Sequence, residues 1–488
     1  MPIACTVHQH LVDAAFGSSR SDKVLDVINP STGRLLCRIP AGCQADVELA
    51  VRASRRAFED GRWLTQTPSS RKRILHRWAD LILTEARELD ALDAAEMGKP
   101  ISERSFSAAN AADLVRFHAE AIDKLAGDVL VSDVHSLVVQ TLVPRGVVAA
   151  VVPWNFPTFN AVLKAAPGLA AGNCVILKPS ELSSRSALRL ATLALDAGVP
   201  PGVLNVVLGA GEVVGEALGL HPEVDMIAFT GSSRVGKAML HYAAKSNMKV
   251  VLAECGGKSP QIVFSDCPDL DAVAGAIAGG LVTNQGQLCS VGSRLIVHAP
   301  VQARLLEKIV ARLKSVVVGD ALNPAVTFGP LASRGQCERV MEYIMGAPGE
   351  GARLVTGGRR LLQETGGYFV EPTVFAVSSH DARICQEEVF GPVLSVIPFS
   401  TEEEAIHLAN STIYGLMAYV WTASLSTGMR MAKGVQSSVI VNASAPVGIG
   451  PGHAFSSEPA RQSGIGVEGG LRGLESYARR KSVWFSHS

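Results

Sequence analysis

The stretch from residue 147 to residue 254 decides the fold. It holds five short apolar runs that read as strands: VVAAVV (147–152), CVILK (174–178), LNVVL (204–208), MIAFT (226–230) and KVVLAE (249–254). Three segments between these runs are suited to helices, at 184–198, 212–219 and 233–246. Apolar runs that alternate with helices predict a parallel sheet covered on both faces. The carboxyl ends of such strands are the expected place for a nucleotide.

The rest of the chain extends this pattern in both directions. A second α/β region is predicted to begin near Gly257, with strand candidates QIVFS (261–265), RLIVH (294–298), PVLSVIPF (392–399), LMAYVWT (416–422) and SVIVN (438–442). The first ~125 residues read as mainly helical, because apolar residues such as Leu75, Trp78 and Ile82 recur at helical spacing. Two further runs, SLVVQTLVP (136–144) and SYARRKSVWF (476–485), look like strands outside both regions.

The composition argues against several classes of protein. The chain has 488 residues, of which 47% are hydrophobic and 18% charged, as in globular proteins. Lys plus Arg and Asp plus Glu are both 45, so no charge imbalance favours nucleic acid or an anionic membrane as a partner. The nine cysteines show neither zinc-like spacing nor C-x-x-C pairs, so we expect no metal. Reduced thiols, and a start (MPIACTVHQH) without the pattern of a signal peptide, predict a cytoplasmic protein.

Two glycine-rich elements follow strand candidates. In GAGEVVG (209–215) the third glycine comes one position too late for the dinucleotide fingerprint, and a tight turn explains the element about as well. In FTGSSRVG (229–236) the glycines could let a helix N-terminus approach a pyrophosphate. Each element alone is weak evidence for a nucleotide site.

Three reactive side chains stand in unusual surroundings. Cys289 lies in NQGQLCSVGSR, a segment of small residues, where it is either a nucleophile or an inert buried cysteine. Glu254 ends an apolar run in LAECGGK and is either an ion-pair partner or a base shielded from water. Asn155 stands between the two prolines of PWNFP, which fix the direction of its amide, although a turn-stabilising role is equally open.

Taken together, the motifs are far more specific than they are apart. They occur in the order PWNFP (153–157), LKPSE (177–181), FTGS (229–232), ECGGK (254–258), GQLCSVGSR (286–294) and EEVFGPV (387–393). With these motifs the chain resembles the aldehyde dehydrogenase superfamily over nearly its whole length. Three segments are most like the bacterial subgroup that acts on amino-aldehydes such as γ-glutamyl-aminobutyraldehyde: SNMKVVLAECGGKSP (246–260), FSDCPDLDA (264–272) and ETGGYFVEPTVF (364–375).

The resemblance implies a reaction, the NAD-dependent oxidation of an aldehyde to its carboxylic acid. Cys289 would add to the aldehyde as a thiolate and form a thiohemiacetal. The side-chain amide of Asn155 and the backbone N–H of Cys289 would stabilise the oxyanion. Glu254 would activate the water that hydrolyses the thioester, and Lys164 would hold Glu254 or relay protons.

The resemblance also implies binding residues. For the cofactor, the resemblance implies three groups of residues. Lys178 and Glu181 would contact the adenine ribose, and Trp154, Glu388 and Phe390 would surround the nicotinamide ribose. The phosphate-binding elements would contain Gly211, Gly231, Ser232 and Gly236. NAD is expected to be preferred over NADP, because the charge of Glu181 would repel a 2′-phosphate. The substrate-pocket set is Asn110, Asp113, Phe159, Asn160, Leu163 and Phe455. Because most of that lining is apolar, we expect medium-sized uncharged aldehydes as substrates, with no strong preference for cationic ones.

The fold implied is the α/β aldehyde dehydrogenase fold. It has a Rossmann-like NAD-binding domain (1–125 and 146–256), an α/β catalytic domain (257–455) and β-strand oligomerisation arms (126–145 and 472–488). The arms predict a homodimer or homotetramer.

Two departures from the family pattern stand out. Cys255 replaces the leucine of E-L-G-G-K, and HAFSSEPARQSG (453–464) replaces a loop with P-F-G-G-x-K, which leaves substrate identity open. Two alternatives are a CoA-acylating semialdehyde dehydrogenase and a catalytically silent structural or binding homologue. The presence of Glu254 argues against the first alternative, and the three intact catalytic residues argue against the second.

Overall fold

The computed structural model describes residues 7–443, 453 and 455–487. Its first sheet has eight strands in the order β2-β1-β9-β8-β7-β10-β11-β23, where β1 is His10–Val12, β2 is Ala15–Gly17 and β23 is Gly464–Ile465. Five of them are parallel to one another: β7 (Val147–Val151), β8 (Cys174–Lys178), β9 (Leu204–Val206), β10 (Met226–Thr230) and β11 (Val250–Glu254). These are the five runs that the sequence predicts to be strands.

Helices cover both faces of this sheet because alternate residues of its strands point to opposite sides. Val148 and Ala150 of β7 belong to one core with α2 (Pro68–Thr84), α4 (Ala108–Ala121), α5 (Pro157–Ala170) and α6 (Arg185–Ala197). Val147 and Ala149 belong to another core with α1 (Gln44–Glu59), α7 (Glu216–Leu220) and α8 (Ser233–Lys245). The first sheet is therefore the middle layer of three.

The second sheet repeats this architecture. Its seven strands are, in order, β14 (Ala352–Thr356), β17 (Thr373–Val377), β18 (Val393–Phe399), β13 (Arg294–His298), β12 (Pro260–Val263), β20 (Met417–Trp421) and β21 (Ser438–Val441). Helices α9 (Leu270–Val282) and α10 (Gln302–Leu313) pack on one face. Helices α11 (Arg334–Gly346), α13 (Glu402–Asn410) and α14 (Leu425–Gly434) pack on the other.

The reading of the first ~125 residues as mainly helical is wrong for their first part. Four strands precede α1: β1 (His10–Val12), β2 (Ala15–Gly17), β3 (Val24–Asn29) and β4 (Arg34–Pro40). Strand β1 extends the first sheet by pairing Leu11 with Val206 of β9. These strands are short and their partners lie far along the chain, so local periodicity does not reveal them.

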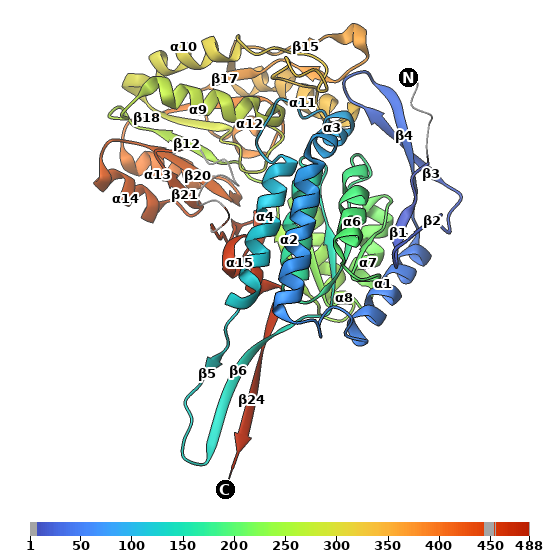
Figure 1. The fold of residues 1–488 in the computed structure, drawn as a ribbon. Helices are drawn as coiled ribbons and strands as arrows, with labels where there is room; N and C mark the ends of the chain where they lie inside the picture. The colour runs from blue at the N-terminus through green and yellow to red at the C-terminus, as the bar shows by residue number, and fades with distance from the viewer. Residues whose placement is uncertain (1–6, 444–452, 454, 488) are drawn as a thin grey trace.

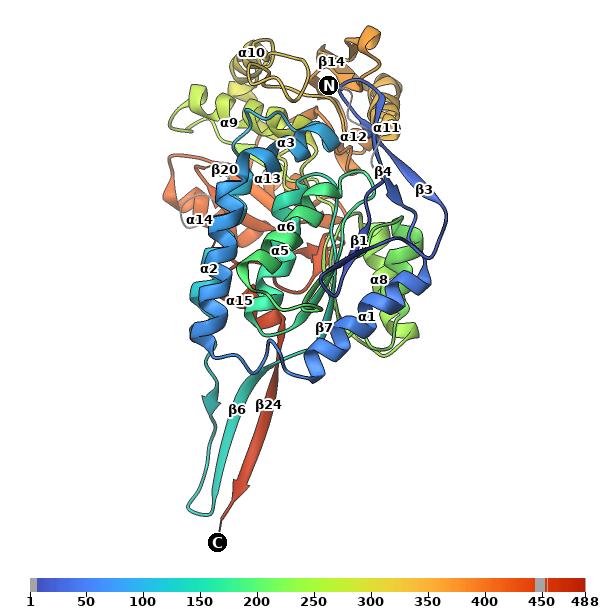
Figure 2. The ribbon, with the colours of Figure 1, turned by 45° about the vertical axis from the view of Figure 1, so that its right-hand side comes forward.

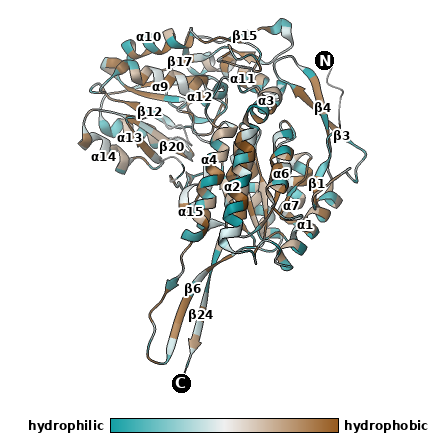
Figure 3. Cartoon of the chain, in the orientation of Figure 1, coloured by the Kyte–Doolittle hydropathy of each residue, from teal (hydrophilic) through white to brown (hydrophobic). Residues whose placement is uncertain are grey.

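An arm of three strands projects from the body (Figures 1 and 2). It consists of β5 (Asp128–Val129), β6 (Ser136–Pro144) and β24 (Ala478–Ser486), in the order β24-β6-β5. Large apolar side chains on it are exposed, with Val131 98% and Trp484 73% accessible, and Figure 3 shows apolar colour along β6. Among the described helices, none is both long and apolar enough to cross a membrane.

Candidate active site

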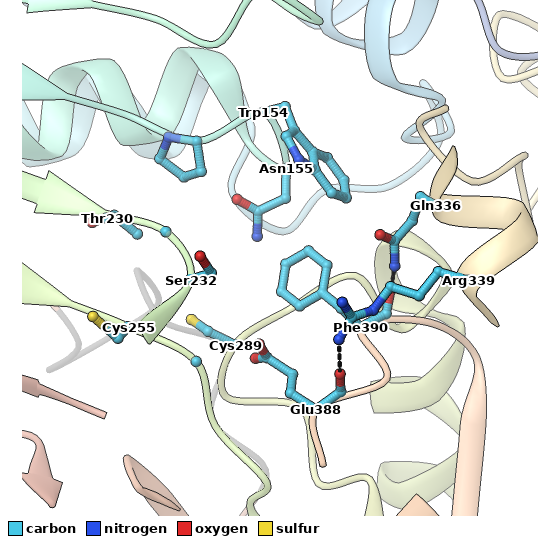
Figure 4. A pocket seen from close by; sticks show the side chains of 13 residues that line it. Trp154, Asn155, Thr230, Ser232, Cys255, Cys289, Gln336, Arg339, Glu388 and Phe390 are labelled. Atoms are coloured by element: carbon cyan, nitrogen blue, oxygen red, sulfur yellow. Dashed lines mark hydrogen bonds between the residues drawn. The ribbon is translucent and has the colours of Figure 1, made fainter. Parts of the chain in front are cut away.

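Two cavities meet at Cys289. The first is lined by residues of the PWNFP, FTGS, ECGGK and EEVFGPV motifs, and Figure 4 shows their side chains converging on it. The second is lined mainly by apolar side chains and contains Glu254. The two walls share Asn155, Thr230 and Cys289. The predicted nucleophile therefore stands where the contents of both cavities can reach it.

Side-chain amide hydrogen bonds connect the loop that carries Cys289 to the PWNFP turn. After α9, Asn284 and Gln285 both adopt left-handed backbone conformations, with φ of 46° and 56°. The side chain of Asn284 donates to the carbonyl of Asn155 at 2.7 Å. The side chain of Asn155 in turn donates to the carbonyl of Gln287 at 3.0 Å. The PWNFP turn and the Cys289 loop thus hold each other in place.

The amide of Asn155 is oriented by its other neighbours. Its Oδ1 accepts a hydrogen bond from Asn160 at 3.3 Å, so its nitrogen is the end that donates. One N–H is used by the Gln287 carbonyl, and the amide has a second N–H to offer. Figure 4 shows this amide pointing into the first cavity on the side of Cys289. It fits the oxyanion-donor position that the resemblance gave it.

The surroundings of Cys289 disfavour its thiolate form. Burial, followed by the negative charges of Glu388 and Glu254, raises its pKa to about 12. The thiolate is the nucleophilic form, so the site needs a compensating positive charge before Cys289 can attack.

Glu254 ends β11 with its carboxyl group in the second cavity. It is 8% exposed, and its Oε1 has no hydrogen-bond partner within the described residues. Burial raises its pKa well above the ordinary value, the charge of Glu468 raises it further, and Lys164 opposes the shift. An unpaired carboxylate with a raised pKa suits a general base.

Lys164 is close enough to Glu254 to affect its pKa, but its ion pair is with another carboxylate. It is fully buried on α5 and forms its ion pair with Glu468 instead of holding Glu254. The carboxylate of Glu468 also lines the second cavity. Sequence reasoning missed Glu468, because it belongs to none of the six motifs and only the fold brings it to Glu254.

The phosphate-binding candidates lie at the start of α8. Ser232 is the N-cap of this helix and accepts from the N–H of Val235. A Cβ on Gly231 would lie 2.5 Å from the Phe229 ring, and one on Gly236 would lie 2.5 Å from the sulfur of Cys255. A side chain at either position would have to displace these neighbours, and a helix N-terminus of this kind suits an anion.

The adenine-ribose candidates group together. Lys178 Nζ lies 3.4 Å from Glu181 Oε2, and burial lowers the pKa of Lys178. Gly211 stands beside them, since a Cβ there would be 3.8 Å from Lys178 Nζ. These three residues, like Gly236, lie outside the wall of the first cavity.

The nicotinamide-ribose candidates line the first cavity as expected. The Trp154 and Phe390 rings are 5.3 Å apart, edge to face. Glu388 accepts from the N–H of Gly257 at 2.9 Å, and burial raises its pKa to about 7.

Sequence reasoning missed two polar residues in this wall. Gln336 donates to the carbonyl of Phe390 at 2.7 Å, and Arg339 donates to the carbonyl of Glu388 at 3.0 Å. Both stand on α11, outside every motif, so no local pattern marks them.

The structure brings part of the predicted substrate-pocket set together. Four of its members line the second cavity: Phe159, Asn160, Leu163 and Phe455. Asn110 and Asp113 do not, and their placement was wrong. Asn110 closes the capping box of α4 with Ser107, and Asp113 forms a half-exposed ion pair with Arg116.

The wall of the second cavity contains more apolar residues than the sequence analysis predicted. It also includes Phe106, Leu114, Phe156, Leu288, Leu416 and Met417. Among the described residues, no group of three or more His, Cys, Asp or Glu side chains could hold a metal ion.

The altered C-terminal loop is tied to the ECGGK turn. Ser463 is fully buried, and its Oγ donates to the carbonyl of Gly256 at 2.7 Å and accepts from the N–H of Gly415 at 2.9 Å. Strand β23 (Gly464–Ile465) then pairs with β11 beside Glu254. Ala454, within this loop, lies outside the described residues.

Comparisons with known proteins agree with this geometry. The model of the aldehyde dehydrogenase family matches residues 16–483. The NADP/NAD-dependent aldehyde dehydrogenase PuuC of Escherichia coli (strain K12) is 40% identical over 483 residues, which cover 97% of this chain and 95% of that protein. The solved γ-glutamyl-γ-aminobutyraldehyde dehydrogenase of Burkholderia cenocepacia J2315 has a TM-score of 0.95 at 45% identity, covering 99% of this chain and 97% of that one.

A third relative was solved with ligands. The indole-3-acetaldehyde dehydrogenase of P. syringae, a mutant in complex with NAD+ and IAA, has a TM-score of 0.96 at 42% identity, covering 99% of this chain and 97% of that one. Similarity this high over almost the whole length shows that the chain belongs to the aldehyde dehydrogenase family.

Proposed function

We propose that the protein oxidises an aldehyde to its carboxylic acid with NAD as the oxidant, through a thioester on Cys289. The observation that carries this proposal is the position of Cys289 in the walls of both cavities. A thiol at that junction reaches the substrate in the second cavity and the cofactor in the first. Overall, aldehyde, NAD and water give acid, NADH and a proton.

The residues of the site support each step. Cys289 releases its proton to solvent and its thiolate sulfur bonds to the carbonyl carbon; the oxyanion that forms is stabilised by the free N–H of Asn155 and the backbone N–H of Cys289. Glu254 takes a proton from water, which attacks the thioester carbon and releases the acid from Cys289. Burial is the main cause of the raised pKa of Glu254, and the ion pair of Lys164 with Glu468 keeps a second carboxylate close by that raises it further.

The first cavity fits the cofactor. Thr230 Oγ1 is buried there with no hydrogen-bond partner among the described residues, and Gly231 and Ser232 at the start of α8 line the same cavity. Gly231 and Ser232 would hold the pyrophosphate, Lys178 and Glu181 the adenine ribose, and Glu388 the nicotinamide ribose. When bound, NAD supplies the hydride acceptor and a positive charge beside the thiol. Residues 1–125 and 146–256 form the proposed NAD-binding domain, and residues 257–455 the catalytic domain.

The second cavity supports medium-sized, uncharged substrates. Its volume is about 160 Å³, close to the roughly 150 Å³ of an engineered apolar cavity that binds benzene. Asp113, which could have paired with an ammonium group, lies outside it. Glu254 and Glu468 are the carboxylates in its wall, and Glu468 is already paired with Lys164. Hexanal and benzaldehyde are therefore expected to be better substrates than aminobutyraldehyde.

We also propose a homodimer or homotetramer joined through the arm, on the strength of its exposed apolar residues. The cytoplasmic location stays a prediction from the reduced cysteines.

NADH formation at its absorbance band, with hexanal and with or without CoA, tests the reaction. Cys289→Ala should abolish it, whereas Cys255→Ala, which alters the other thiol in the first cavity, should retain most activity. Equal activity of wild type and Cys289→Ala would refute the mechanism, and a requirement for CoA would favour the acylating alternative. Replacing NAD by NADP should lower kcat/KM, because Glu181 faces the ribose site; equal values would refute that assignment.

A further inference from the structure

A third cavity lies on the other side of the loop that carries Cys289. Its wall includes Gly279 and Gly280 of α9, Leu288, the segment 291–292 and Phe106. We call it the α9 cavity. Its volume is about 450 Å³, against about 160 Å³ for the second cavity at Cys289, which we call the substrate cavity.

The α9 cavity is open and uncharged. A Cβ built on Gly279 or Gly280 meets no atom within 4 Å, whereas one on Gly275 would lie 3.5 Å from Cζ of Arg312, so α9 is uncovered at Gly279 and Gly280. Its described wall contains no Asp, Glu, Lys, Arg or His side chain. Two of its polar groups already have hydrogen-bond partners: the Tyr419 hydroxyl donates to the carbonyl of Ser290, and Oε1 of Gln261 accepts from Trp421. Such a wall favours alkyl or aryl groups over charged ones.

Phe106 and Leu288 belong to the walls of both this cavity and the substrate cavity. Phe106 is 7% exposed, and its ring centroid lies 4.3 Å from that of Phe156 and 5.1 Å from that of Phe159. Its φ is 54°, a left-handed conformation that a bulky residue rarely adopts.

A buried lysine side chain binds the backbone of the loop that precedes Phe106. Lys99 is 1% exposed, and its Nζ donates to the carbonyls of Glu103 and Ser105 at 3.4 Å each. Backbone strain of this kind persists only where the surroundings enforce it. The enforced conformation keeps the aromatic ring between the two cavities.

We propose that Phe106 is a specificity-determining residue: its ring ends the substrate cavity and keeps the distal part of long, uncharged aldehydes out of the α9 cavity. The inference rests on the proposed oxidation of aldehydes and adds to it a limit on substrate length. With the ring removed, the two cavities join, and the α9 cavity becomes a second apolar subsite.

The test compares kcat/KM for decanal and butanal in Phe106→Gly and wild type. Glycine suits a φ of 54° and removes the ring. Each methylene that enters an apolar cavity contributes about fourfold in binding. We expect the decanal-to-butanal ratio to rise at least tenfold. Phe106→Leu keeps most of the packing, should give a smaller rise in the ratio, and replaces the glycine variant if that fails to fold.

A second substitution locates the effect. Gly279→Phe, added to Phe106→Gly, fills the α9 cavity, where its Cβ has open space, and should return the ratio to the wild-type value. Gly346→Phe is the matched control, because Gly346 is an exposed helical glycine with equal space that lines neither cavity. It should leave the raised ratio unchanged. A ratio that never rises, or that stays high with Gly279→Phe, overturns the proposal.

Binding of an unreactive alcohol separates this inference from the proposed function. If wild type forms no NADH with butanal, the oxidation is refuted, and calorimetry with decan-1-ol still tests the subsite. The expected result is at least tenfold tighter binding in Phe106→Gly, lost again in Phe106→Gly/Gly279→Phe. Equal affinity in all three proteins would show that the α9 cavity receives no alkyl chain.

Discussion

At the scale of single residues, two carboxylates and one ammonium group lie together at the proposed base: Glu254, Glu468 and Lys164. Glu468 raises the pKa of Glu254 and Lys164 lowers it, while Lys164 is bound directly to Glu468. Burial is the largest cause of the raised pKa of Glu254, and this pair of charged neighbours modifies it. Sequence motifs located Glu254, Cys289 and Asn155, because each sits in a local pattern. They could not locate Glu468, whose role depends on a contact across the fold.

Glu254→Gln should separate the two halves of the reaction. The amide cannot accept a proton from water, so steady turnover should fall by about 10²–10⁴, the usual contribution of a general base. The thioester should still form, so a first-turnover burst of NADH should survive in rapid-mixing absorbance measurements. Loss of the burst together with turnover would assign Glu254 to the attack step instead.

The position of the acid limb of kcat should depend on Glu468. Glu254 acts when deprotonated, so turnover falls as the pH drops through its raised pKa. Glu468→Gln removes a negative charge, lowers that pKa and should move the limb to lower pH. Lys164→Met removes the opposing cation and should move it to higher pH. Identical pH profiles for both variants and wild type would show that neither residue tunes the base.

At the scale of elements, uninterrupted runs of apolar residues were the pattern that predicted strands best. All five runs between 147 and 254 are strands, because a central parallel strand is buried on both faces and its sequence shows it. The strands before α1 were missed, since each is short and depends on a distant partner. Asn110 and Asp113 were misplaced for a related reason. Their helix was identified through the family, but which of its faces meets the cavity is fixed by packing.

Ser463→Ala should loosen the altered C-terminal loop. The substitution leaves the carbonyl of Gly256 and the N–H of Gly415 without their buried partner, at a cost of about 1–3 kcal/mol. Urea unfolding should show a lower midpoint. Ser233→Ala removes an exposed hydrogen bond to Gln462 and serves as the control, expected to change stability by less than about 0.5 kcal/mol. Equal midpoints for both variants would show that the loop does not depend on Ser463.

For the whole molecule, the family and the fold could be predicted from the sequence, and both are confirmed. Six motifs in a fixed order specify one architecture, so the two sheets followed directly. The dimensions of the cavities could not be predicted, because they depend on side chains contributed by many elements. The arm was visible as two outlying strands, and the structure pairs them along their full length.

Trp484→Glu should reduce the size of the assembly. Trp484 is 73% exposed on β24, an edge strand of the arm, and a charge there opposes burial against a neighbouring subunit. Sedimentation velocity should show a smaller species than wild type. Leu83→Glu, at an exposed position on α2, should sediment like wild type. An unchanged Trp484→Glu assembly would place the subunit interface elsewhere.

The small overlap between the two cavities that meet at Cys289 has an evolutionary consequence. Their walls share three residues, Asn155, Thr230 and Cys289. Substitutions in the two walls that lie more than about 7–10 Å apart and share no partner combine additively. Coenzyme preference and aldehyde preference can therefore diverge independently within a lineage, and improvements selected for one can be transplanted onto variants selected for the other.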